Sequence, residues 1–543
     1  MIGRRPVLLL LNGSIHTMSQ DQPRVTALAI DRVSGRILAT GDDSTIRALA
    51  GPLTDTLDLK GRTVLPGFID AHTHLVGYAM TRLEVNVRDT HSEQEAVERA
   101  AARAHDLPVG DWITGHGWSI DQWSPQRLPT RASLDAAIPD HPVALWNHSY
   151  HAVWVNGAAL RAAGITAETA DPPEGTIARD GSGEPTGMFF ENSAIQLVER
   201  VIPEPPEERI LAEVRNALAS MRARGITGIH NIEDAHSLHL LQRLHARGEL
   251  TPRVLLYIPR ASLPDAVKLG LEAGFGDDYL RFGGVKLFMD GALGSFTAAM
   301  FDPYEGQPQN RGLLTLTDED TTRMVTEAAG GRIGVAIHAI GDRAVHAALD
   351  GIEHALQQTS VRTARDLPDP VRLRLEHVQL AAPEDIQRMA RLGVIASVQP
   401  FHAVVDRDAA ERYWGLRHKR AYAYNTLRTS GIPLALGSDV PVDTCDPLRV
   451  LQAAVARTDD QTPERGAWLP DEALPVAQAL WSYTAGAAWA GGQEAHQGML
   501  EAGKLADMVV LADDPFTLPA QRLAQLEVVA TLAGGELVHG SLE

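Results

Sequence analysis

Short apolar runs alternate with turn signals in residues 1–64, a pattern that predicts β-structure. The runs are VLLLL, ALAIDR, GRILATG and LDLKGRTVL, separated by Asn-Gly, Ser-Gly and Gly-Asp dipeptides that favour turns. The pattern returns near the C-terminus in GKLADMVVLADDP and VVATLAGGELVHG. Because chain ends often lie close together, we expect residues 1–64 and 491–543 to form one small β-sandwich domain.

Strand-like and helix-like segments alternate between these ends, in residues 65–490. The candidate strands are GFIDAH, VALWNH, GITGIHN, RVLLYI, GGVKLFMD, GVAIHAIG, RLRLEHV, GVIASVQ and IPLALGSD. Helical patterns such as SEQEAVERAAARAH and TDEDTTRMVTEAAG lie between most of them, the second with a Thr-x-x-Asp start. About eight such units predict an α/β fold, a (β/α)8 TIM-like barrel. The loop-rich stretch 171–192 predicts an insertion, around 115–200, over the barrel mouth.

Composition narrows the class of protein. The chain has 543 residues, 44% hydrophobic and 22% charged, with a net charge of −20, which disfavours nucleic acid and anionic membranes as partners. The single cysteine, Cys445, excludes an intrachain disulfide, and we interpret it as structural. The N-terminal apolar run is too short for a signal peptide, and no run approaches the ~18 residues of a membrane span. We therefore expect a cytoplasmic protein that acts on a small molecule. The sequence leaves a homodimer open.

Chemically active side chains follow the predicted barrel strands where each strand ends. They are His72, His74, Lys286, His338, His377 and Asp439. Such residues converge at the C-terminal face of a barrel. Side chains two apart on a strand share a face, so the two histidines of the His-x-His pair supply half of a tetrahedral zinc site. Any one of these residues alone is compatible with a structural role, but five strand ends with metal-ligand chemistry favour a metal centre.

These residues and their flanking motifs resemble the metal-dependent amidohydrolase superfamily, in particular the group that includes N-substituted formamide deformylases. The resemblance is carried by LPGFIDAHTHL, GVKLFMDGALGS, HAIGDRAV, LEHVQ, GSDVPV and GKLADMVVL, together with HAVWVNGAAL and GEPTGMFFENSA. It spans nearly the whole chain and specifies no substrate.

The resemblance implies which residues bind metal. His72, His74 and Asp439 would hold the more buried ion, and His338 and His377 the second, with Lys286 bridging the two as a CO2-derived carbamate. An ammonium group has no acceptor and cannot ligate a cation, whereas a carbamate can. The expected metal is Zn2+, one or two ions per chain. Without the carbamate, a single zinc on His72, His74, His338 and Asp439 remains the alternative.

The implied function is hydrolysis of a C–N bond of a small organic molecule: an amide, formamide, imide or carbamate. Metal-activated hydroxide would attack, and Asp439 would be the catalytic residue that moves the proton to the leaving nitrogen. The alternatives are an esterase or lactonase that uses the same site, and a non-catalytic barrel scaffold. Deaminase branches carry His-x-x-Glu after the fifth strand. Here His338 is followed by Ala-Ile-Gly-Asp342, which disfavours a nucleobase deaminase.

Candidate substrate contacts lie beside these strand ends, and each also has a structural interpretation. They are His151, Asp290, Gly291, Trp118 and His230. Asp70 precedes both histidines of the His-x-His pair by an even number of residues, so we expect it to support them from behind. His116, His148 and His402 stay unassigned.

Overall fold

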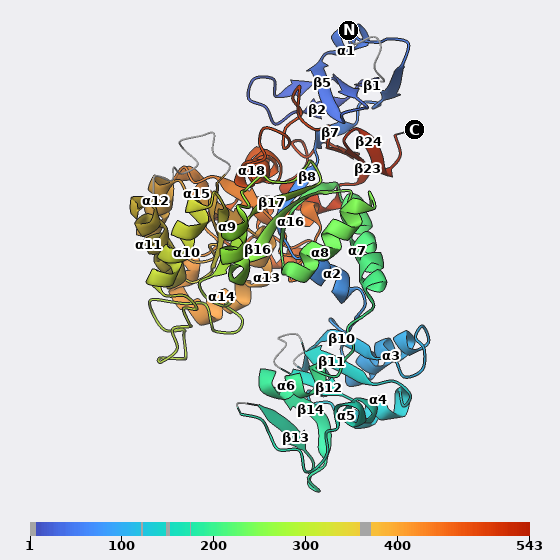
Figure 1. Cartoon of the computed structure of the whole chain (residues 1–543), viewed down its shortest axis with the longest axis vertical. Helices are drawn as coiled ribbons and strands as arrows, with labels where there is room; N and C mark the ends of the chain where they lie inside the picture. The colour runs from blue at the N-terminus through green and yellow to red at the C-terminus, as the bar shows by residue number, and fades with distance from the viewer. Residues whose placement is uncertain (1–6, 121–122, 148–151, 174, 359–370, 543) are drawn as a thin grey trace. The chain divides into compact units, whose positions relative to one another are not determined.

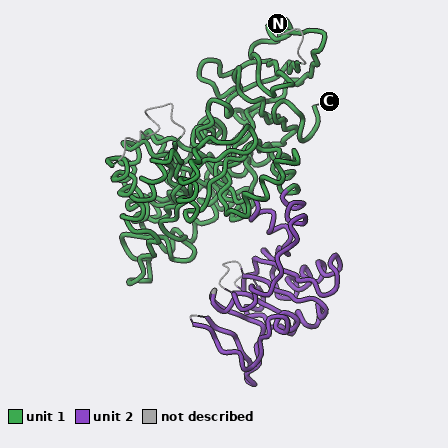
Figure 2. The backbone as a smooth tube through the Cα atoms, in the orientation of Figure 1, with its two compact units in different colours: residues 1–75, 215–543 green, residues 76–214 purple. Residues whose placement is uncertain are grey.

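A computed structural model describes residues 7–120, 123–147, 152–173, 175–358 and 371–542. The chain divides into two compact units, which are coloured separately in Figure 2. Unit 1 comprises Met1–Leu75 and Arg215–Glu543, and unit 2 comprises Val76–Val214. Each unit is described by itself.

Eight parallel strands form the central sheet of unit 1. Neighbouring strands pair in the order β21-β20-β19-β18-β17-β16-β15-β8. A further parallel bridge, between Thr73 and Val440, joins the two edges, so the sheet closes almost completely into a barrel. The strands are β8 (Phe68–Thr73), β15 (Ile226–Ile232), β16 (Arg253–Pro259), β17 (Leu280–Phe288), β18 (Gly334–Ala339), β19 (Leu373–His377), β20 (Ile395–Val398) and β21 (Leu434–Leu436).

These strands form because their apolar runs can be covered on both faces. Almost every residue of β8, β15, β18 and β19 is buried, as expected for parallel strands between a packed interior and outer helices. Ile232, Leu255, Tyr257 and Ala336 form one apolar cluster of the barrel. The (β/α)8 barrel predicted from the sequence is therefore confirmed.

Helices follow most of the barrel strands. At the left of Figure 1, α10, α11 and α12 pack beside one another. Thr317 caps α10 by accepting a hydrogen bond from the Asp320 N–H, as its Thr-x-x-Asp start predicts. The helices of this unit's barrel region are α8 (Ala235–Ala246), α9 (Leu263–Leu269), α10 (Asp318–Gly330), α11 (Asp342–Gln358), α12 (Pro383–Leu392), α13 (Pro400–Val405), α14 (Arg407–Trp414), α15 (Tyr424–Thr429), α16 (Pro447–Ala456), α17 (Val476–Ser482) and α18 (Ala485–Ala490).

Both ends of the chain contribute to a β-sandwich in unit 1. A six-stranded sheet, β24-β23-β22-β7-β2-β3, lies against a four-stranded sheet, β5-β4-β1-β6. β7 pairs antiparallel with β22, with Val64 opposite Val510, and an apolar core that includes Leu8, Leu28 and Val510 holds the sheets together. The elements are β1 (Val7–Leu11), β2 (Ser14–His16), β3 (Arg24–Val25), β4 (Ala27–Asp31), β5 (Arg36–Gly41), α1 (Asp43–Arg47), β6 (Thr54–Asp58), β7 (Thr63–Pro66), β22 (Met508–Leu511), β23 (Val528–Ala533) and β24 (Glu536–Gly540).

Unit 2 contains a mixed six-stranded sheet, β13-β14-β12-β11-β10-β9, and its own apolar core. It is longer than the insertion expected around 115–200, because β9, α3 and β10 pack with the later strands. VALWNH contributes β11, a strand of this sheet and not of the barrel, since it pairs with β10 and β12. The elements are α2 (Leu75–Thr81), β9 (Val85–Asn86), α3 (Glu93–Ala104), β10 (Ile113–Trp118), α4 (Arg131–Ala137), β11 (Val143–Asn147), β12 (Ala152–Val155), α5 (Gly157–Ala163), β13 (Thr176–Arg179), β14 (Pro185–Phe190) and α6 (Asn192–Glu199); α7 (Glu207–Arg222) leads back to β15.

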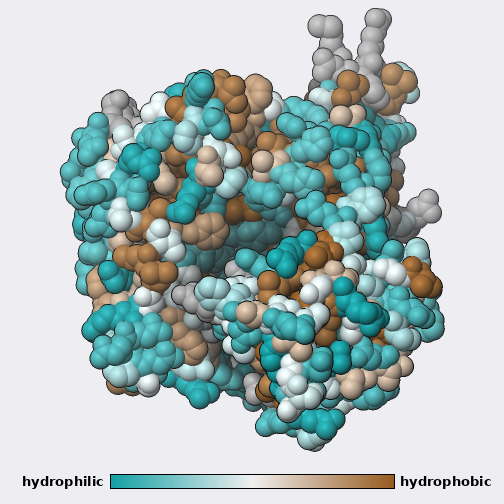
Figure 3. Space-filling view, turned by 60° about the horizontal axis from the view of Figure 1, so that its bottom comes forward, coloured by the Kyte–Doolittle hydropathy of each residue, from teal (hydrophilic) through white to brown (hydrophobic). Residues whose placement is uncertain are grey.

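The surface is largely polar on the face drawn in Figure 3, where apolar side chains gather only in scattered patches. Within the described part of the chain, no helix combines the length and the apolar character that crossing a membrane requires.

Candidate metal centre

Asp439 lies at the centre of the site, just after β21. It belongs to two groups of potential metal ligands, one with His72 and His74 and one with His377 and His402, and the ligand atoms of each group lie within 4.8 Å of one another. Its Oδ1 is 3.0 Å from His74 Nε2 and 3.5 Å from His72 Nε2. Its Oδ2 is 3.2 Å from His402 Nε2 and 4.0 Å from His377 Nδ1. One carboxylate thus faces two histidine pairs.

The backbone at this site is held in a rare conformation. His377 and Asp439 have φ angles of 74° and 60°, in the left-handed region that residues other than glycine seldom adopt. Such conformations cluster at functional sites, where the surrounding structure maintains them. His377 is the last residue of β19, and Asp439 lies just after the end of β21.

Each of three histidines around Asp439 is oriented through its Nδ1 atom. His72 Nδ1 lies 2.6 Å from Glu376 Oε2, His74 Nδ1 lies 2.6 Å from the Ile232 carbonyl oxygen, and His402 Nδ1 lies 2.6 Å from Asp443 Oδ2. An oxygen at Nδ1 fixes the orientation of the ring and directs the lone pair of Nε2 toward a metal. This arrangement is common in metal-binding histidines.

A buried ionic pair lies beneath His72. Arg374 donates two hydrogen bonds to the Glu376 carboxylate and a third, at 2.5 Å, to the Ala71 carbonyl. Burial would raise the pKa of Glu376, but the charges of Arg374 and His72 hold it well below its usual range. Glu376 is therefore an anion that can stabilise a cationic His72–metal unit. Nothing in the sequence pattern assigns a role to Arg374 or Glu376, although Glu376 directly precedes a predicted ligand.

Lys286 is fully enclosed near the end of β17. Burial lowers its pKa to about 8, although the carboxylates of Glu376 and Asp439 act in the opposite direction. The lowered pKa makes the neutral amine, the form that reacts with CO2, accessible near neutral pH. Its assignment as a carbamate bridge stays a prediction.

His338 and the loop after β17 are linked. His338 Nε2 is 3.0 Å from the Gly291 carbonyl oxygen and is not part of either group of ligands around Asp439 among the described residues. Asp290 accepts hydrogen bonds from the backbone N–H groups of Ile340, Gly341 and Ala299. The structure thus places Asp290 and Gly291 as groups that position the loops around His338, and direct contact with substrate stays a prediction.

The other candidate substrate contacts belong to different parts of the chain. His151 is not among the described residues. Trp118 packs in the core of unit 2, where its indole donates a hydrogen bond to the Leu145 carbonyl. His230 is buried on β15, with Nδ1 2.7 Å from the Arg374 guanidinium, and a Cβ atom at Gly491 would lie 2.9 Å from its Nε2.

Asp70 supports the ligand strands from behind, as expected. Its Oδ1 accepts hydrogen bonds from the backbone N–H groups of His72, at 3.2 Å, and Ser438, at 2.8 Å. It therefore connects the strand that carries the His-x-His pair to the segment that carries Asp439. A Cβ atom at Gly437 would lie 2.6 Å from the His72 nitrogen, so this close approach requires glycine.

His402, which the sequence left unassigned, also lies beside Asp439. It lies in α13, four residues after the end of β20. It is not part of a His-x-His pair, the motif that predicts His72 and His74 as ligands. The one available signal is that a histidine follows the end of a barrel strand in a sequence whose other strand ends carry ligands.

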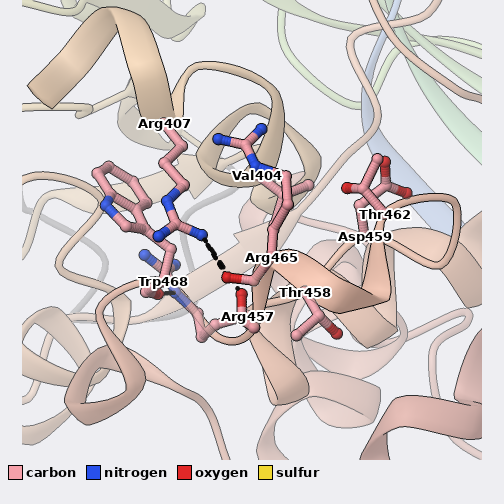
Figure 4. Close-up of a pocket in the computed structure, with 9 residues that line it drawn as sticks. Val404, Arg407, Arg457, Thr458, Asp459, Thr462, Arg465 and Trp468 are labelled. Carbon is pink, nitrogen blue, oxygen red and sulfur yellow. Dashed lines mark hydrogen bonds between the residues drawn. The ribbon is translucent and has the colours of Figure 1, made fainter. Parts of the chain in front are cut away.

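A small pocket elsewhere in unit 1 is lined by none of the candidate metal ligands. Figure 4 shows this pocket, where Arg407 donates a hydrogen bond to the backbone oxygen of Arg465 beside Trp468. Its volume is about 10 Å³, enough for about one water molecule. This pocket is therefore too small for an organic substrate.

These residues fit a divalent transition metal. Imidazole nitrogens and carboxylate oxygens are zinc ligands. His377 Nδ1 is buried and has no hydrogen-bond partner among the described residues. Buried polar atoms are normally paired, so a metal ion is a suitable partner for this nitrogen.

Comparison with known proteins identifies the family. The model of the amidohydrolase family matches residues 55–539, most of the chain. The chain belongs to the amidohydrolase family. It is 32% identical to the YtcJ protein of Bacillus subtilis over 97% of this chain and 98% of that one. It is 30% identical to an N-substituted formamide deformylase of Arthrobacter pascens, over 98% of each.

A solved structure agrees with this assignment. An uncharacterized metal-dependent hydrolase from Pyrococcus furiosus superposes with a TM-score of 0.77 at 28% identity, covering 94% of this chain and 100% of that chain. This amidohydrolase is therefore a metal-dependent enzyme that hydrolyses carbon–nitrogen bonds, as the sequence resemblance implied.

Proposed function

We propose that this amidohydrolase cleaves an amide, formamide, imide or carbamate bond of a small organic molecule. The observation that carries the proposal is the Asp439 carboxylate, whose two oxygens face separate histidine pairs. A carboxylate so placed can ligate metal and accept a proton at one point of the barrel mouth.

The residues that would hold metal are those around Asp439. The family resemblance assigns His72, His74 and Asp439 to one Zn2+ ion and His338 and His377 to a second, with a Lys286 carbamate between them. A bound divalent ion supplies Lewis acidity, which polarises a substrate carbonyl and makes water a stronger acid. The lowered pKa of Lys286 supports the carbamate, because only the neutral amine adds to CO2.

Asp439 provides the proton transfer. Burial would raise the pKa of its carboxyl, but His72, His402, His74 and His377 hold that pKa well below its usual range. At neutral pH it is therefore a carboxylate that can accept the proton lost by an attacking water. The water oxygen bonds to the carbonyl carbon, the C–N bond breaks, and the proton passes from Asp439 to the leaving nitrogen.

A matched panel of substrates tests this proposal. Metal-loaded protein is assayed on N-formyl amines, anilides, cyclic imides and carbamates, and on the ester and lactone of the same acyl groups. We expect turnover of at least one C–N substrate and its loss in His72→Ala. Turnover confined to esters and lactones would favour the esterase alternative, and binding without any turnover would favour the scaffold; both results would contradict the proposal.

A further inference from the structure

We propose that His402 is a metal ligand, which together with His377 and Asp439 Oδ2 holds one of the ions of the centre. The site consists of His402 Nε2, His377 Nδ1 and the Asp439 oxygen that faces them. This inference rests on the proposed function and deepens it, because at the same centre His402 takes the place beside His377 that the family resemblance gave to His338.

The distances around the two oxygens of Asp439 are alike. Ligand atoms that lie ~2.0–2.2 Å from a tetrahedral zinc are about 3.3–3.6 Å from one another. On the Oδ1 side, His74 and His72 lie at 3.0 and 3.5 Å. On the Oδ2 side, His402 and His377 lie at 3.2 and 4.0 Å. The second side therefore needs little rearrangement to surround an ion.

The orientation of His402 matches that of the His-x-His pair. All three rings have Nδ1 2.6 Å from an oxygen and Nε2 turned to Asp439. For His402 that oxygen belongs to Asp443, whose side chain is 12% exposed. A carboxylate–histidine pair is a usual support for a metal ligand.

An orphaned atom points to the same place. His377 is fully buried, and its Nδ1 has no hydrogen-bond partner within the part of the chain that the structure describes. Buried polar atoms are normally paired. An ion beside Asp439 Oδ2 would satisfy His377 Nδ1 and His402 Nε2 together.

His338 differs from His402 in its surroundings. Its Nε2 is turned to the Gly291 carbonyl at 3.0 Å, and Asp290 Oδ1 lies 3.5 Å away. His402, in the segment after β20, therefore turns its Nε2 to Asp439 Oδ2, whereas His338 of β18 does not.

Metal titration tests the proposal without any need for turnover. Apoprotein is titrated with Zn2+ against a chromophoric chelator, which gives the number of ions per chain and their affinities. We expect two ions in the unaltered protein. In His402→Ala the first ion should bind as before and the second should be lost. In Asp443→Asn, which keeps the ligand but removes its orienting charge, the second affinity should fall about 10–100-fold.

A matched control is available in His245, which forms a similar pair with Asp277, with Nε2 2.8 Å from Oδ2, on the outer helix α8. The His245→Ala variant should bind both ions with unchanged affinity.

Two results would overturn the proposal: unchanged affinities for both ions in His402→Ala, or binding of a single ion by the unaltered protein. If His402→Ala does not fold, Asp443→Asn decides: a weaker second ion supports the proposal and an unchanged one overturns it. A failed substrate panel with these ion counts intact would overturn the proposed function alone.

Discussion

Individual side chains in this amidohydrolase set the charge at the metal centre. The Glu376 carboxylate lies 2.6 Å from His72 Nδ1 and forms an ion pair with Arg374. Both residues are completely buried. The basicity of His72 and the stability of the barrel therefore both depend on the Arg374–Glu376 pair.

Replacement of Glu376 by Gln should weaken metal binding and stability together. The amide oxygen can still accept the His72 hydrogen bond, but the loss of its charge should lower zinc affinity about 10–100-fold. Arg374 then has no buried counter-ion, which costs about 3–5 kcal/mol of unfolding free energy. Chelator competition and denaturant unfolding measure the two effects. Glu353→Gln, at a carboxylate paired with Arg388 on the outer helices, should change neither by much.

The pH dependence of carbamate formation follows from Lys286. Its pKa is lowered to about 8, so the neutral amine is the minor form below pH 8 and the major form above it. At constant dissolved CO2, the carbamate signal of ¹³C-labelled apoprotein should therefore rise as pH increases through about 8. Lys286→Arg should give no such signal. A signal that rises only at the pKa of an ordinary exposed lysine would contradict the buried assignment.

At the scale of elements, the ends of helices are determined by local sequence. A substitution at such an end can change stability without affecting the metal centre. Thr317 caps α10, and its hydroxyl accepts the Asp320 N–H at 3.1 Å. Thr317→Ala should cost about 1 kcal/mol in denaturant unfolding and leave zinc affinity unchanged. Thr322→Ala, in the same helix but away from the cap, should be neutral or slightly stabilising. Equal effects of the two changes would show that the cap contributes nothing.

How much the sequence could predict also differs from element to element. All eight barrel strands were predicted, because each is an apolar run bounded by polar or turn residues. VALWNH has the same local pattern, and only its pairing with β10 and β12 places it in unit 2. His402 and Glu376 escaped assignment for a related reason: their roles come from contacts with Asp439, Asp443 and His72, which lie tens to hundreds of residues away.

At the scale of the whole molecule, a buried ion pair connects the barrel to the β-sandwich within unit 1. Arg253 of β16 forms two hydrogen bonds to Asp507, which directly precedes β22. Arg253→Met should cost about 3–5 kcal/mol, because Asp507 stays buried without its partner. Arg32→Met removes an exposed pair with Asp55 and should cost less than about 1 kcal/mol. Denaturant unfolding of both variants measures the difference, and equal losses would contradict a structural role for the buried pair.

The central claim is that a metal centre built on Asp439 hydrolyses C–N bonds. Its most direct test is the rate of amide or formamide hydrolysis on chelated protein, before and after zinc is restored, in the unaltered chain and in Asp439→Asn. We predict that chelation abolishes turnover, that zinc restores it in the unaltered chain, and that Asp439→Asn stays at least about 10²-fold slower after zinc. Turnover that survives chelation, or that zinc restores equally in Asp439→Asn, would contradict the claim.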